Sequence, residues 1–347
     1  MRWIASSCIY GCLAAALTTG CVESSGETET DTSNTSDSDG ETGDLLCEMA
    51  AQPCVDESAC TPLATDYQPR TNGSADDMWP TCIADAGSYT LVASEPGSIA
   101  RVQAFESIAD LLWRNGTPSA ADFTEARTVY VTPEGLESRL VRREDLHYPA
   151  IPMEDWDDQV DADKQCTVPA NVTKYPERCA GPAVIGPLIT ENFVAGQDGT
   201  GEPDVAAARI EAALLWFYYL SAYKEANTCL TKSKDCDSAW AYYTGGFQID
   251  GGIGMAGYVR QLSENAHTRI FDGVLAMRCY AEYSEASDAS EWFDLGTEQL
   301  DQALHRGYTV IVRERLLQHL LNLREGSGTE LSWAFLEVAG PVLDREA

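Results

Sequence analysis

The chain has 347 residues, of which 44% are hydrophobic, and its 55 aspartates and glutamates outnumber its 23 lysines and arginines, giving a formal net charge of −32. This charge argues against nucleic acid as a partner, because binding a phosphate backbone requires clustered basic side chains. The hydrophobic content is too high for a chain that is disordered throughout, so we expect a globular body.

The N-terminal segment predicts export. Residues 1–20 combine a basic start at Arg2 with an apolar stretch too short to span a membrane, and small residues precede Cys21. This pattern resembles a bacterial lipoprotein signal, although Thr18 stands where a leucine is usual. We therefore predict lipidation at Cys21, contact with the membrane through this lipid anchor only, and a location at the outer membrane or cell surface facing the periplasm or exterior. Secretion without an anchor is the alternative.

Two segments separate this signal from the rest of the chain. Residues 21–44 carry eight carboxylates and no basic residue, among Ser, Thr and Gly, and this composition cannot bury enough apolar surface to fold. We predict a disordered acidic tether. Residues 45–95 are rich in turn signals and contain four cysteines, so we predict a small, irregular, Cys-rich cap.

The nine cysteines that follow Cys21 indicate disulfides and an oxidising compartment. We predict two bridges among Cys47, Cys54, Cys60 and Cys82, which lie close together in the sequence. Cys166 with Cys179 and Cys229 with Cys236 close loops of suitable size and are expected to pair. Cys279 is then left over and is expected to be a buried thiol that acts as a small apolar side chain, because its segment has the composition of a helix.

Residues 96–347 predict a helical domain. Apolar residues recur at intervals of three and four over 99–114, and Thr117-Pro118 provides the cap and first-turn proline of a second helix that reaches residue 130. A third helix is predicted at 136–147. The Gly- and Pro-rich span 166–203 is expected to be irregular.

The second half of this domain contains the most apolar helix, predicted at 205–223. Arg209 and Glu211 within it favour a central core helix over a membrane span. Aromatic helices that run into glycine recur along the chain and indicate duplicated hairpins. We therefore predict an all-α bundle of repeated helical hairpins with a small disulfide-rich N-terminal cap, and its remaining helices at 237–243, 257–286, 292–323 and 330–338.

The spacing of glutamate and histidine provides candidate metal ligands. Glu144 precedes His147 by three residues, and Glu264 precedes His267 by three; on a helix such pairs share one face and can bind one ion together. Glu211, nearly alone in an apolar helix, needs a cation because an unpaired buried carboxylate is costly. Two Glu-x-x-His pairs, together with carboxylates from two further helices, are typical of di-iron bundles. The five residues predict a site for iron or a similar cation, although an acidic chain also places Glu near His by chance.

Motifs of common enzymes are absent from the sequence. There is no HExxH, P-loop or GxSxG signature. The GxGxxG match at 252–257 follows no predicted strand, so we interpret it as a bend between helices rather than a dinucleotide site.

Two segments, FTEARTVYVTPEG at 123–135 and DSAWAYYTGG at 237–246, lie in a chain with the features of an exported helical protein. They resemble the low-iron-inducible periplasmic proteins of algae, the Fea-type iron-assimilation family. The resemblance covers about residues 98–345 and implies iron binding or help with iron uptake outside the inner membrane, but it identifies no ligand residue. We expect an envelope-anchored lipoprotein that binds iron or a similar cation without turnover. A metal-free module that contacts another protein and an oxidative di-iron enzyme are the alternatives.

Overall fold

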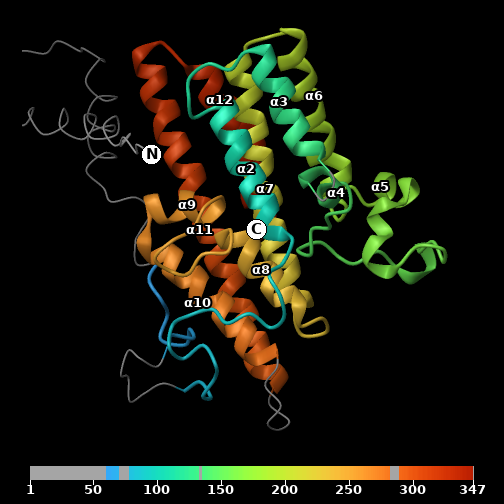
Figure 1. Ribbon diagram of the computed structural model, residues 1–347, viewed down its shortest axis with the longest axis vertical. Coiled ribbons are helices and arrows are strands. Elements are labelled where there is room, and N and C mark those ends of the chain that lie inside the picture. The colour runs from blue at the N-terminus through green and yellow to red at the C-terminus, as the bar shows by residue number, and fades with distance from the viewer. Residues whose placement is uncertain (1–59, 70–77, 133–134, 282–288, 347) are drawn as a thin grey trace, which may run out of the picture. The chain divides into compact units, whose positions relative to one another are not determined.

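The computed structural model describes residues 60–69, 78–132, 135–281 and 289–346 (Figure 1). The contacts within the chain divide it into two units, 1–51 and 52–347, and the described residues belong to the second. The predicted signal, the tether and the lipidation site Cys21 therefore lie outside the described residues. Within the described ranges, no helix combines the length and the apolarity that a membrane crossing requires.

The described residues form a helical bundle, and all their regular secondary structure is helical, as the sequence predicted (Figure 1). The repetition of hairpins stays a prediction. The longer helices are α2 (Ser98–Leu112), α3 (Ala120–Val131), α6 (Gly186–Asp198), α7 (Pro203–Thr228), α8 (Lys234–Thr244), α9 (Met255–Leu262), α10 (Glu264–Ala281), α11 (Ala289–Glu325) and α12 (Thr329–Ala339). The shorter elements are α4 (Leu136–Leu140), α5 (Pro169–Lys174), a π-helical turn at Gly181–Ile185 and 3-10 segments at Met153–Asp155, Ala162–Thr167 and Gly340–Glu346.

Helix α7 is the core of the bundle. It packs against α6, α8, α11 and α12, and the side chains of Phe217, Tyr218 and Tyr219 are all completely buried although they point in different directions around the helix. A helix that is apolar on all sides belongs in the interior of a domain. The prediction of a central core helix in this part of the sequence is therefore confirmed.

Residues 186–198 form α6, so the prediction of an irregular span over 166–203 is wrong here. Pro187 lies in the first turn of the helix, directly after the π-helical turn Gly181–Ile185, and a proline is tolerated in a first turn. Gly196 allows α3 to approach, because a Cβ at this position would lie only 2.3 Å from the ring of Phe123. The glycine and proline residues that suggested a loop instead begin the helix and allow it to pack.

Three further helix boundaries differ from the sequence prediction. The second helix is capped by Ser119, which forms a capping box with Asp122, so Thr117 is not its cap and Pro118 is not in its first turn. The helix predicted at 136–147 ends at Leu140 as α4. The helix predicted at 257–286 is divided into α9 and α10 at Ser263, whose backbone is extended and whose Oγ accepts a hydrogen bond from the N–H of Ala266 at 3.1 Å. A serine in this role begins a new helix, and this explains the break.

The disulfides confirm two predicted pairs and correct a third prediction. Cys166 is bonded to Cys179, and Cys229 to Cys236, as loop length indicated. Cys82 is bonded to Cys279 of α10, so neither a bridge from Cys82 within the N-terminal cysteines nor a free thiol at Cys279 is correct. Three disulfides among the described residues indicate an oxidising environment outside the cytoplasm.

The described part of the predicted cap, residues 60–69 and 78–95, contains turns and bends only. Besides the Cys82 disulfide, aromatic side chains join it to the bundle: Trp79 and Tyr67 contact the ring of Tyr280 at centroid distances of 5.3 and 6.1 Å. Asp237 of α8 accepts hydrogen bonds from the Tyr89 hydroxyl and from backbone N–H groups that follow it. These contacts fix the chain as it enters α2.

Candidate functional site

Glu144 and His147 lie in irregular backbone after α4, so they do not share a helical face as predicted. The chain leaves the helix because it forms bonds with another segment. The N–H of Asp145 donates to the carbonyl oxygen of Arg178 at 2.8 Å, and the Arg178 guanidinium pairs with the Glu144 carboxylate at 2.7 Å. These bonds between separate segments outweigh the local helical preference.

His147 lies in a buried cluster of carboxylates and tyrosines. Its Nδ1 is 2.7 Å from Asp145 Oδ1, its Nε2 is 3.0 Å from Asp301 Oδ1, and its ring stacks on Tyr223. Burial lowers the pKa of the imidazole, but the hydrogen bonds and charges of the two aspartates outweigh burial and raise the pKa to about 9. At neutral pH the ring is protonated, and a protonated imidazole has no lone pair to give to a metal ion.

Glu264 and His267 lie one turn apart on α10, as the spacing predicted. Both ring nitrogens of the buried His267 are engaged: Nε2 donates to the Ile249 carbonyl at 2.9 Å, and Nδ1 accepts from the Tyr243 hydroxyl at 2.9 Å. Burial lowers the pKa of His267, so its ring is neutral. Glu264 is exposed and acts on His267 through its charge.

Glu211 is buried, and its predicted need for a cation is met by Arg315, with which it forms an ion pair. The Tyr258 hydroxyl donates to the same carboxylate at 2.6 Å. The predicted ligands Glu144, His147 and Glu211 thus have different partners, and the described ranges contain no group of three or more His, Cys, Asp or Glu residues arranged to hold a metal ion. Iron binding stays a prediction.

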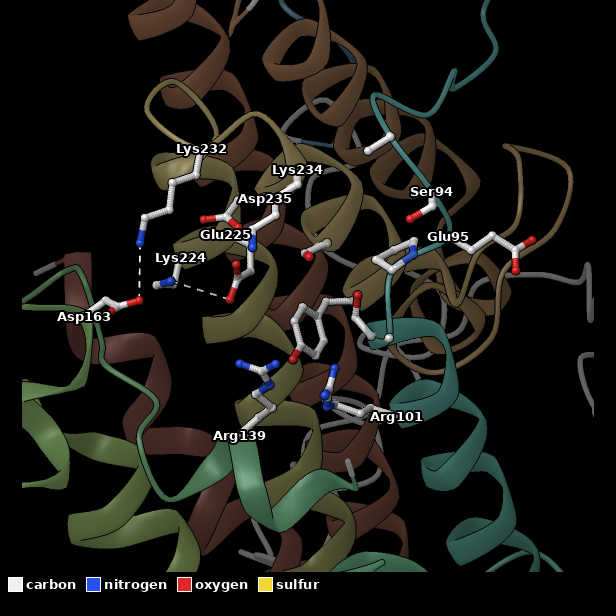
Figure 2. A pocket seen from close by; sticks show the side chains of 16 residues that line it. Ser94, Glu95, Arg101, Arg139, Asp163, Lys224, Glu225, Lys232, Lys234 and Asp235 are labelled. Carbon is white, nitrogen blue, oxygen red and sulfur yellow. Dashed lines mark hydrogen bonds and ion pairs between the residues drawn. The ribbon is translucent and has the colours of Figure 1, made fainter. Parts of the chain in front are cut away.

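A pocket with an unusual charge lies elsewhere in the bundle. It has a volume of about 420 Å³ and is lined by the start of α2, by α4, by the end of α7 and by α8 (Figure 2). Five of its lining residues are basic and four are acidic, whereas in the whole chain acidic residues outnumber basic ones by 55 to 23. The basic residues are Arg101, Arg139, Lys224, Lys232 and Lys234, and the acidic residues are Glu95, Asp163, Glu225 and Asp235.

Helix α2 begins at the wall of this pocket, where Gly97 and Ser98 line it. The first N–H groups of a helix lack partners within the helix, and the helix dipole adds partial positive charge there. Ser98 is only 2% exposed, and its Oγ has no hydrogen-bond partner in the described part of the chain. A buried hydroxyl without a partner is destabilising, and an oxygen atom of a ligand would satisfy it.

Two arginines lie on the side of the pocket away from Lys232 and Lys234 (Figure 2). Arg101 belongs to the first turn of α2 and is buried. Arg139 projects from α4, is partly exposed, and forms no hydrogen bond or ion pair with a described residue. Its guanidinium is therefore available to a ligand.

Glu225 does not neutralise this positive charge. Its carboxylate is 2.9 Å from Arg143, behind the pocket, and 3.6 Å from Lys224. Burial raises the pKa of Glu225, but the charges of Arg143 and Lys224 outweigh burial, so the pKa is lowered and the group is ionised; Arg139 contributes to this effect. Over the whole lining, five basic residues face four acidic ones, so the pocket has a small excess of positive charge in a strongly acidic chain.

Sequence reasoning missed this pocket because its residues come from separate segments. One signal was present: three of the chain's five lysines lie between residues 224 and 234. In a chain this acidic, such a cluster indicates a local positive site. The arginines and Ser98 carry no comparable signal, because only the fold brings them to the lysines.

Comparisons with known proteins assign no family: no family model, no curated protein and no solved structure matches the chain. The resemblance to the low-iron-inducible proteins therefore stays a prediction. The function has to be inferred from the geometry of the chain itself.

Proposed function

We propose that the protein is an exported binding protein for a small anionic ligand, which it holds by a phosphate or carboxylate group in this pocket. The observation that carries the proposal is the convergence of three features in one pocket: the Arg139 guanidinium, the buried Ser98 hydroxyl without a partner among the described residues, and the positive end of the α2 dipole. Guanidinium groups and helix N-termini are the groups with which proteins bind phosphate and carboxylate.

The composition of the wall supports a compact and strongly polar ligand. Apart from the ring of Tyr242, the residues without a polar side chain are Ala93, Pro96 and Gly97. Pockets for aromatic or lipid-like ligands are lined mainly by apolar and aromatic side chains. The ligand therefore needs no aromatic ring.

Removing the Arg139 charge tests the proposal directly. We expect Arg139→Gln to weaken the binding of inorganic phosphate or acetate by roughly tenfold or more, because hydrogen bonds to charged groups contribute about 1.5–3 kcal/mol. Isothermal titration calorimetry of the purified protein measures the affinity. Arg127→Gln is the matched control, because Arg127 lies on α3, bonds to Gln197 and does not line the pocket.

Two results would contradict the proposal. One is a wild-type protein that binds neither anion at millimolar concentration, and the other is an Arg139→Gln variant that binds as tightly as the wild type. Arg139 forms no hydrogen bond or ion pair with a described residue, and the buried Glu225, on which its charge acts, keeps its ion pair with Arg143, so the variant is expected to fold.

We also propose that the protein is anchored at the outer membrane or cell surface through a lipid on Cys21. The signal-like sequence before Cys21 and the acidic segment after it support this location. Mass spectrometry of the mature N-terminus tests the lipid, and an unmodified cysteine or a different N-terminus would contradict it.

A further inference from the structure

We infer that the pocket contains a second anion subsite, formed by Lys232 and Lys234, and that its preferred ligand carries two separated anionic groups. This inference rests on the proposed function, in which Arg139 and the start of α2 bind the first group. The geometry that supports it is the separation of the basic residues into two sets, with the arginines at one side of the pocket and these two lysines at the other (Figure 2).

Both lysines have positive charge available for a ligand. Lys234 is exposed and forms no hydrogen bond or ion pair with a described residue. Lys232 pairs with Asp163 at 3.3 Å, and these two side chains are 46% and 48% exposed. An ion pair exposed to this extent contributes little, so an anionic group of a ligand can replace Asp163 as the partner of Lys232.

The backbone that carries the two lysines is held in place. Lys232 and Lys234 lie within the loop that the Cys229–Cys236 disulfide closes, between the end of α7 and the start of α8. The disulfide therefore restrains the backbone of the subsite relative to α7 before a ligand binds, so less backbone entropy is lost on binding.

A ligand whose two anionic groups reach both subsites binds more tightly because the groups are covalently linked. Once its first anionic group is bound, the second is held at a high effective concentration near the lysines, provided that the connecting chain spans the distance. A single anionic group gains nothing in this way. The difference in affinity between ligands of equal length that carry one or two anionic groups therefore reports on the second subsite.

A series of alkane bisphosphonates, each compared with the monophosphonate of the same carbon chain, provides the test. By calorimetry, at least one bisphosphonate is expected to bind the wild type roughly tenfold or more tighter than its monophosphonate. The double variant Lys232→Gln/Lys234→Gln is expected to reduce this ratio towards the statistical factor of about two. Asp163→Asn is expected to increase it, because the competing carboxylate is lost.

The control is Lys164→Gln/Lys174→Gln, which removes the same charge from the chain's other two lysines, neither of which lines the pocket. We expect it to keep the wild-type ratio. The inference is overturned if no bisphosphonate is preferred, or if the preference survives in the Lys232→Gln/Lys234→Gln variant. If one of these two results is found but the monophosphonates bind the wild type and bind Arg139→Gln more weakly, the proposed function stands and only the second subsite fails. If no phosphonate binds, both fail.

Discussion

His147 shows how one protonated side chain joins separate parts of this bundle. Its imidazolium lies between Asp145, in the irregular chain after α4, and Asp301 of α11, and it stacks on Tyr223 of α7. Ionised groups that are buried are stabilising when their partners satisfy them and destabilising when a partner is lost. The cluster therefore connects three segments only while the ring holds its second proton.

The stability that His147 provides is expected to depend on pH. Its pKa is about 9 in the fold, against 6.5 ordinarily, so its contribution is complete below about pH 6.5 and is lost as the pH rises through 9. The difference in unfolding free energy between the wild type and His147→Gln is expected to fall by about 3 kcal/mol between pH 6 and pH 10. Urea denaturation with the disulfides intact measures this difference.

Comparison with the variant also removes the effects of other titrating groups. Asp272, for example, has its pKa raised to about 8 by burial, with a further contribution from the charge of Asp66, but it is present in both proteins. A difference in unfolding free energy that is constant from pH 6 to pH 10 would show that the ring is not held in its protonated form.

At the level of elements, the sequence predicted the helices that have a clear apolar pattern and missed those shaped by contacts elsewhere. The periodicity at 99–114 and the apolar run at 205–223 correspond to α2 and α7. The helix predicted at 136–147 ends early because the chain after it bonds to Arg178, which is distant in the sequence. A local pattern contains no information about such a partner.

The candidate site was predictable to a smaller extent. The spacing of Glu264 and His267 correctly placed them on one face of α10, but it could not show that the Tyr243 hydroxyl and a carbonyl oxygen occupy both ring nitrogens. The lysines of the pocket were visible as a cluster, whereas Arg139 and Ser98 join them only through the packing of α4 and α2. Spacing predicts neighbours within a helix and not between helices.

Close packing of α3 on α6 leads to a prediction for Gly196. Gly196→Ala is expected to destabilise the protein by about 1–3 kcal/mol, because the new methyl group would lie 2.3 Å from the Phe123 ring, a distance that forces the helices apart. The control Gly340→Ala meets no atom within 4 Å and has helical backbone angles, so it is expected to leave stability unchanged or slightly higher. Chemical denaturation measures both, and equal stabilities of the two variants would contradict the packing argument.

For the whole molecule, the positive pocket lies in a chain whose formal net charge is −32. An approaching anion is repelled by the chain as a whole at long range and attracted by the pocket at short range. Added salt screens the long-range repulsion before the short-range attraction, since the Debye length falls from about 30 Å at 0.01 M to about 10 Å at 0.1 M. The two contributions can therefore be separated by ionic strength.

We expect the association rate of a bisphosphonate to rise over this range of salt, by roughly twofold or more, because the long-range repulsion is removed. Stopped-flow measurement of association tests this, with the buffer and pH kept constant while the salt concentration is varied. A rate that falls steadily with salt would show instead that the basic residues of the pocket dominate the approach as well as the bound state.

The bond between Cys82 and Cys279 spans 197 residues of sequence. A chain exported from its N-terminus delivers Cys82 to the oxidising side long before Cys279 arrives, and in that interval the earlier cysteine meets only the thiols that precede Cys279 in the sequence. Formation of the native bond therefore has to wait until most of the polypeptide has been translocated. Any premature bridge made by Cys82 must be exchanged by a thiol–disulfide isomerase or a small thiol before the protein matures.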